Sequence, residues 1–195
     1  MSETSLSLLD QLCFRPDAAA WDRLVRVYTP LLQAWLRRYD VLSAADVDDL
    51  VQEVLLTVSQ EVGRFNHNQA PGAFRGWLRA ILINRLRHFW RGRDHRPAAI
   101  GGSDFLEQLD LLQDDASQVS RLWDSEHDRQ LMRRLLDEIQ PRFAVSTWQA
   151  FCRQVLDGDA AERVAEELGM PLHSVYAAKS RVLKALRSAG AGLLS

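Results

Sequence analysis

The sequence predicts an all-α protein with two helical domains joined by an acidic linker. Apolar residues recur at three- and four-residue steps through most of the 195-residue chain, which is the spacing of one face of an α-helix. Charge is separated into blocks: residues 75–96 hold seven arginines and one acid, whereas residues 43–62 hold five acids and no base. Separated charge on a chain with a net charge of −2 predicts separate surfaces for separate partners.

Composition and cysteine usage exclude several classes of protein. With 47% hydrophobic and 26% charged residues, the chain has the composition of an ordinary globular protein of one or two domains. It has no apolar run near the ~18 residues of a membrane span, and its start lacks the pattern of a signal peptide. Cys13 and Cys152 lack metal-ligand spacing and suit a reducing compartment. We therefore expect a cytoplasmic protein that binds neither membrane nor metal.

The first part of the chain predicts core helices. Residues 5–12 could form a short helix, and Pro16 with Asp17 marks the start of the next. The apolar stripe of that helix is Trp21, Leu24, Val27, Tyr28, Leu31, Leu32, Trp35 and Leu36. Pro30 lies inside this pattern and should kink or divide the helix. We interpret the aromatic residues as core.

An acidic helix is predicted from about Asp46 to Val62. Its buried face comprises Val47, Leu50, Val51, Val54, Leu55 and Val58. The opposite face carries Asp48, Asp49, Gln52, Glu53 and Leu56. A single exposed leucine usually has no function, but a leucine among acidic and polar residues is also typical of a small protein-docking site. Spacing alone leaves both interpretations open.

A basic helix is predicted over residues 74–93, after a loop at residues 65–73 that contains Asn, Pro and Gly. Its core stripe is Phe74, Trp77, Leu78, Ile81 and Phe89. Asn84, Arg87 and Arg91 share another side, within roughly 60°. Ile83 and Trp90 lie between the two, beside arginines. Such a surface can hold phosphates and stack on an exposed base; the alternative is a solvated basic face with one stray tryptophan.

The remaining chain predicts a linker and a second helical domain. Residues 94–125 contain Pro, Gly and five acids between 104 and 115, which indicates an acidic linker with one helical turn near residues 105–112. Helices follow around Leu131–Ile139 and Trp148–Val155, and Asp159 with Glu162 has capping-box spacing. Gly169 is the expected turn residue before a last helix. That helix begins near Leu172 and should bury Val175, Ala178, Val182 and Leu186. A glycine turn followed by a basic helix is typical of a helix-turn-helix.

Two segments resemble one family, the bacterial RNA polymerase sigma factors. DVDDLVQEVLLTV at residues 46–58, followed by FRGWLRAILINRLRHFWR at residues 74–91, resembles their region 2. ERVAEELGMPLHSVYAAKSRVLKALR at residues 162–187 resembles their region 4 helix-turn-helix. The order of these motifs and the acidic linker are similar to the extracytoplasmic-function (ECF) group. The resemblance implies a region 2 domain at residues 1–93, a linker at 94–125 and a region 4 domain at 126–195.

The resemblance also implies a role for each surface. Residues that match the docking site on the clamp helices of the largest polymerase subunit are Asp49, Gln52, Glu53 and Leu56. Residues assigned to the −10 element, which is held open as single strand, are Phe65, Asn66, Asn68, Asn84, Arg87, His88, Trp90 and Arg91. Residues assigned to the major groove at the −35 element are Ser174, Tyr176, Lys179, Ser180, Arg181 and Lys184.

The expected function is therefore a sigma factor that directs RNA polymerase core to promoter DNA, with the clamp helices and the flap as its contacts. An anti-sigma factor is a further partner that the sequence neither requires nor excludes. The five histidines lack ligand spacing, and no catalytic triad or phosphate loop is found, so we expect no enzyme and no cofactor. The alternative is a stand-alone helix-turn-helix regulator, in which residues 20–93 form an oligomerisation or sensor domain.

The last helix departs from the family pattern at three positions. Family members often carry Ser and Arg where this chain has Ala177 and Ala178, which puts the −35 sequence it reads in doubt. Lys179 stands where the family usually has an apolar residue. Because helical geometry puts Lys179 at the edge of the buried stripe, we expect its stem to pack while its ammonium reaches toward phosphate.

Overall fold

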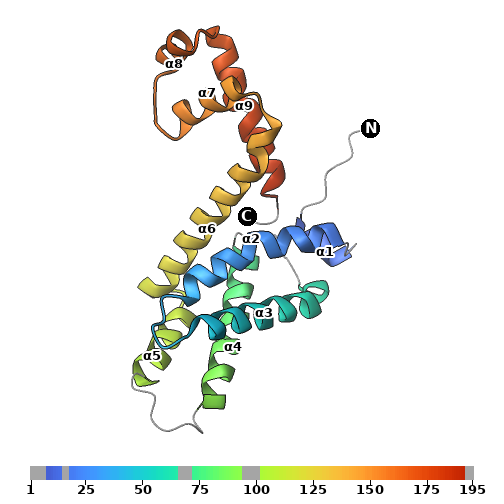
Figure 1. The fold of residues 1–195 in the computed structure, drawn as a ribbon, viewed down its shortest axis with the longest axis vertical. Coiled ribbons are helices and arrows are strands. Elements are labelled where there is room, and N and C mark those ends of the chain that lie inside the picture. The colour runs from blue at the N-terminus through green and yellow to red at the C-terminus, as the bar shows by residue number, and fades with distance from the viewer. Residues whose placement is uncertain (1–7, 15–17, 66–71, 94–101, 192–195) are drawn as a thin grey trace. The chain divides into compact units, whose positions relative to one another are not determined.

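The computed structural model describes residues 8–14, 18–65, 72–93 and 102–191, and every regular element among them is helical (Figure 1). The predicted all-α class is confirmed. Contacts group the chain into two compact units, and the division falls within α6 (Gln118–Ile139), between Leu131 and Met132. None of the helices in the described ranges is long and apolar enough to span a membrane.

The N-terminal unit contains the first five α-helices and the first part of α6. Its elements before α6 are α1 (Leu8–Phe14), α2 (Ala18–Leu36), α3 (Ala44–Glu61), the 3-10 turn η1 (Val62–Arg64), α4 (Ala73–Arg93) and α5 (Gly102–Gln113). The C-terminal unit follows the division in α6. Its further elements are the 3-10 turn η2 (Gln140–Arg142), α7 (Val145–Val155), α8 (Ala161–Leu168) and α9 (Leu172–Ala189).

Helix α2 passes through Pro30 as one element. A proline inside a helix removes one backbone hydrogen bond and costs about 3 kcal/mol. The residues around it, Tyr28, Leu31 and Leu32, are fully or almost fully buried. Packing on both sides of the proline therefore offsets the lost bond, and the predicted division of this helix does not occur. Trp21, predicted as core, is only half-buried.

Helix α3 begins two residues earlier than predicted because Ser43 caps it. The amide of Asp46 donates to Ser43 Oγ at 3.2 Å, and the amide of Ser43 donates to the Asp46 carboxylate at 2.9 Å. This reciprocal pair is a capping box, with Asp in place of the usual Glu. The six apolar residues predicted to be buried on this helix are all buried.

The segment expected to be a linker is helical where the structure describes it. Helix α5 has 12 residues rather than one turn, and α6 begins at Gln118. Phe105, Leu109 and Leu112 are buried, and their spacing of four and three residues places them on one helical face. Because acids surround this stripe, the composition of the segment predicted a linker. In the structure its apolar side chains instead pack onto α4.

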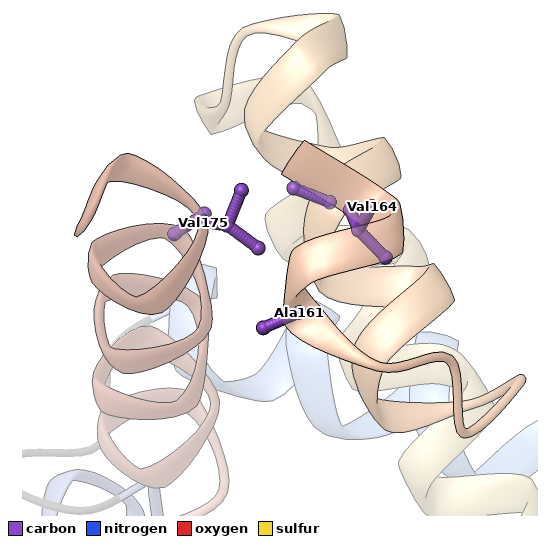
Figure 2. Close-up of a cluster of buried hydrophobic side chains, with 5 residues drawn as sticks. Ala161, Val164 and Val175 are labelled. Carbon is purple, nitrogen blue, oxygen red and sulfur yellow. The ribbon is translucent and has the colours of Figure 1, made fainter. Parts of the chain in front are cut away.

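The core of the C-terminal unit lies between α7, α8 and α9. Figure 2 shows Ala161 and Val164 of α8 lying across from Val175 of α9, and Ala150 and Ala178 complete this cluster. All four residues predicted to be buried on α9 are buried. Gly169 ends α8 in the left-handed conformation, with φ of 60°, which glycine adopts without steric cost.

The predicted capping box at Asp159 is wrong. Ala160 occupies the N-cap position of α8 and makes no side-chain cap. The Asp159 carboxylate instead accepts hydrogen bonds from Arg153 Nε at 2.8 Å and Nη2 at 2.6 Å. A charged, two-point interaction with a guanidinium is stronger than a neutral amide bond, so Asp159 pairs with Arg153 of α7 and does not cap α8.

Candidate nucleic-acid interface

Helix α4 is covered on two sides, which leaves one narrow basic face. Leu78, Leu82 and Leu86 have almost no exposed surface, and Ile83 is buried as well. Helix α3 packs against one side of α4 and α5 against another. In the C-terminal half of α4, the polar side chains that remain accessible include the exposed Asn84, His88 and Arg91 and the half-buried Arg85 and Arg87.

These five side chains line a groove of about 580 Å³, and Leu106 of α5 completes it. A second hollow of about 330 Å³ lies beside it and shares Asn84 and Arg87 with the groove. We call the 580 Å³ hollow the basic groove. Three arginines beside an apolar side chain provide charge for phosphates and a surface for part of a base.

Arg87 is held by α5. Its Nη2 donates to Asp110 Oδ1 at 2.6 Å and to Gln113 Oε1 at 2.7 Å. About a third of the Arg87 side chain stays exposed, and the Asp110 side chain is 74% exposed. Arg87, which was predicted to contact DNA, therefore forms hydrogen bonds with Asp110 and Gln113 of α5. Both partners lie in the segment that was expected to be a linker.

Trp90 does not belong to the exposed face, so its assignment as a stacking platform for a base is wrong in this structure. It is 6% exposed, and its ring lies 4.8 Å from the ring of Phe105. Periodicity placed Trp90 beside the arginines correctly, but α5 covers that position. Its function is to attach α5 to α4.

Two other arginines of α4 hold the fold. Arg79 is 8% exposed and is paired with Asp115 and Ser120. Arg75 Nη1 donates to Asp128 at 2.8 Å, and its Nε lies 2.9 Å from Asp124. The buried guanidinium of Arg79 needs such partners because an unpaired buried charge is costly. In the sequence these arginines look like the groove residues, because their partners lie more than 35 positions away.

The loop before α4 is only partly described. Phe65 is half-buried, and its ring lies 4.7 Å from Trp77 and 5.7 Å from Phe74. Phe65 therefore packs on the start of α4. Asn66 and Asn68, the other predicted −10 residues of this loop, lie outside the described residues.

The acidic face of α3 has the predicted exposure. Leu56 is 58% exposed, and Asp49, Gln52 and Glu53 are exposed on the same side. Thr57, one position further, is buried and donates to the Glu53 carbonyl at 2.8 Å. Leu56 is thus exposed among acidic and polar side chains. The opposite face of α3 is buried and holds the helix in the fold.

The outer face of α9 carries five exposed side chains of the predicted −35 set. Tyr176, Lys179, Ser180, Arg181 and Lys184 are exposed. Ser174 is half-buried, and its Oγ lies 3.3 Å from the ring Nε2 of His173. Arg181 Nε lies 3.3 Å from the Ala177 carbonyl. Lys179 is exposed and follows the buried Ala178 directly.

The surfaces on α3 and α4 both lie in a segment that matches a known family. Residues 24–96 match the family model of Sigma-70 region 2. The match supports a sigma-70 family member with a role in RNA polymerase binding and promoter melting. The matched segment therefore contains both the acidic face around Leu56 and the residues of α4 that line the basic groove.

Two residues of the basic groove were not singled out from the sequence. Arg85 lines it from α4 and Leu106 from α5. Arg85 had a signal only as one member of an arginine-rich run. Leu106 lies in the acidic segment, and its position beside α4 follows from the burial of its neighbours Phe105 and Leu109, which fixes the rotation of α5.

Proposed function

We propose that the chain is a sigma factor of the ECF group. It docks on RNA polymerase core through α3, holds the opened −10 strand along the basic groove of α4, and places α9 in the major groove at the −35 element. The single observation that carries this proposal is the region 2 match, because it covers α3 and α4 together. The ECF assignment rests on the sequence resemblance and the short segment between the two motifs.

Docking is assigned to the acidic face of α3. Leu56 would fill an apolar pocket of the clamp helices while Asp49, Gln52 and Glu53 pair with basic residues around it. An apolar anchor inside a polar rim is the usual anatomy of a protein interface. The C-terminal unit would contact the flap.

The opened −10 strand is assigned to the basic groove. Arg85, Arg87 and Arg91 would contact phosphates, and Asn84 and His88 would bond to bases or sugars. Arginine suits this task because its fork matches phosphate geometry. The loop that carries Phe65, Asn66 and Asn68 would receive an unstacked base.

The −35 duplex is assigned to α9, with α8 and α9 acting as a helix-turn-helix. The exposed Ser180 and Arg181 would reach base edges, with Ser174, Tyr176 and Lys179 around them. Lys184 lies further along the helix and would contact phosphate. A recognition helix reads the major groove through a few polar side chains of this kind.

This function breaks no covalent bond, so we propose a non-enzymatic protein that needs no cofactor. Its place of action would be the cytoplasm, where bacterial transcription occurs. An anti-sigma factor that covers α3 or α4 would be a further partner. The proposed partners supply the energy for promoter opening through binding alone.

The test is a selection from DNA that carries a randomised promoter region, transcribed by core polymerase with and without the purified chain. Templates transcribed only in the presence of the chain should share two short elements at a fixed spacing. A stand-alone regulator would instead enrich a palindrome as duplex without polymerase. That result, or no dependence of transcription on the chain, would overturn the proposal.

A further inference from the structure

We propose that α5 is an internal competitor for the basic groove: Asp110 and Gln113 occupy Arg87 in the free protein, and a DNA phosphate must displace them. This inference rests on the proposed function of α4. It assigns a regulatory role to the acidic segment between the two DNA-binding regions, which would otherwise serve only as a connection.

The contact chemistry carries the first step. Asp110 and Gln113 each present an oxygen to the same nitrogen of Arg87, at 2.6 and 2.7 Å. A carboxylate offers guanidinium the same charge-assisted hydrogen bonds as a phosphate oxygen does. Asp110 and Gln113 together use both N–H groups of Nη2. A phosphate that binds at this nitrogen must therefore displace at least one of them.

Exposure makes this release inexpensive. The Asp110 side chain is 74% exposed, and exposed ion pairs contribute little, equivalent to about a 5-fold change in an equilibrium constant at most. Arg79 provides the contrast, since it is buried and paired with Asp115 and Ser120. Arg87 can therefore exchange partners, whereas Arg79 stays with the fold.

The helix itself need not move. Phe105, Leu109 and Leu112 hold α5 on α4 with their buried side chains, and Trp90 packs against Phe105. Competition is consequently confined to the side chains of Arg87, Asp110 and Gln113. Exposed groove residues such as Arg91 would contact the strand first, and Arg87 would join after it leaves α5.

The experiment measures the affinity of holoenzyme, made from core polymerase and the full chain, for fluorescently labelled single-stranded DNA of randomised sequence at low salt. Core polymerase alone gives the baseline. The test variant is Asp110→Ala with Gln113→Ala. The matched control is Glu107→Ala, which removes the same charge from the exposed side of α5 without a contact to Arg87. Circular dichroism and thermal unfolding check that each variant folds.

The inference predicts that the test variant binds DNA up to about 5-fold more tightly, whereas the control changes far less. Adding Arg87→Ala should abolish the gain, because the two changes are coupled through one contact. Equal gains in test and control variants would mean general charge repulsion and would overturn the inference. Weaker binding by the test variant would mean that α5 positions Arg87 for DNA, which also overturns it.

Failure of the proposed function gives a different pattern. If holoenzyme binds the strand no better than core polymerase alone, the DNA-binding role of α4 fails and the inference fails with it. If Arg87→Ala weakens binding while the α5 variant has no effect, the DNA-binding role stands and only the competition is wrong.

Discussion

At the scale of single residues, the arginines of α4 divide into two classes by the partners that they contact. Arg75 and Arg79 are fixed by acids of the following segments, whereas Arg87 and Arg91 face the basic groove. Arginine thus stabilises the fold at some positions of α4 and is available to bind a partner molecule at others. What distinguishes them is whether an acid of α6 or of the α5–α6 connection reaches them.

Trp90→Ala should destabilise the N-terminal unit. The side chain is buried against Phe105, and truncating a buried tryptophan costs about 3–5 kcal/mol because it leaves a cavity. Denaturant unfolding followed by circular dichroism measures the loss. Trp77→Ala, at a half-buried position of the same helix, should cost less. Unchanged stability of the Trp90 variant would contradict the packing of α5 on α4.

His127 should make stability depend on pH. It is 1% exposed, and burial lowers the pKa of its imidazole. Asp128 and Asp124 favour the charged form, whereas Arg75 opposes it. As pH falls below about 7.5, the unfolded chain therefore binds more protons than the folded chain, until the lowered pKa of His127 is passed. The free energy of unfolding should therefore fall as pH decreases from about 7.5 toward 5.5.

The check is a series of denaturant titrations across this pH range, with His127→Gln as the comparison. Glutamine does not titrate, so its curve should be flatter between about pH 7 and the lowered pKa of His127. If both proteins lose stability with the same slope, another group causes the dependence and the neutral buried histidine is refuted.

At the scale of elements, the proposed docking face of α3 around Leu56 makes a prediction about binding to core polymerase. Replacing Leu56 by Ala and Glu53 by Lys should weaken core polymerase binding, because truncation of a central apolar anchor typically costs ~2 kcal/mol or more. Both residues are exposed, so the helix content should not change. Competition binding against the unmodified chain measures the effect. Equal competition by the double variant would place the docking surface elsewhere.

Helix α9 makes a separate prediction about two kinds of contact. Arg181→Ala should relax sequence preference at one or two −35 positions, at a cost of about 1–3 kcal/mol. Lys184→Ala should weaken all sequences similarly and reduce the salt slope by about one. Holoenzyme binding to a panel of −35 variants at several salt concentrations separates these effects. A uniform loss for Arg181→Ala would show that the base-reading face is misassigned.

The elements differ in how far sequence alone could predict them. On α3 and α9, every position that periodicity predicted to be buried is buried in the structure. The prediction succeeded because each helix has one clear apolar stripe. Helix α5 was predicted as only one turn within a linker, since acids surround the buried Phe105, Leu109 and Leu112. The burial of Trp90 depends on α5, a partner in a different segment, and no pattern local to α4 contains that information. Asp159 was misassigned because Arg153 attracts it more strongly than the α8 amides do.

At the scale of the whole molecule, the proposed partners bind different surfaces in two compact units. The N-terminal unit would bind polymerase through α3 and the opened strand through α4, and the C-terminal unit would bind duplex DNA through α9. In the proposed complex, polymerase core would hold the chain and both DNA elements together. Assembly with core polymerase is therefore the central claim.

That claim is tested most directly by the equilibrium binding of the fluorescently labelled full chain to purified RNA polymerase core, followed by anisotropy and by co-migration in size-exclusion chromatography. The account predicts a saturable one-to-one complex, which unlabelled chain displaces and which the Leu56 and Glu53 double variant displaces poorly. A chain that shows no saturable binding to the core, while it binds promoter duplex alone as a dimer, would contradict the account.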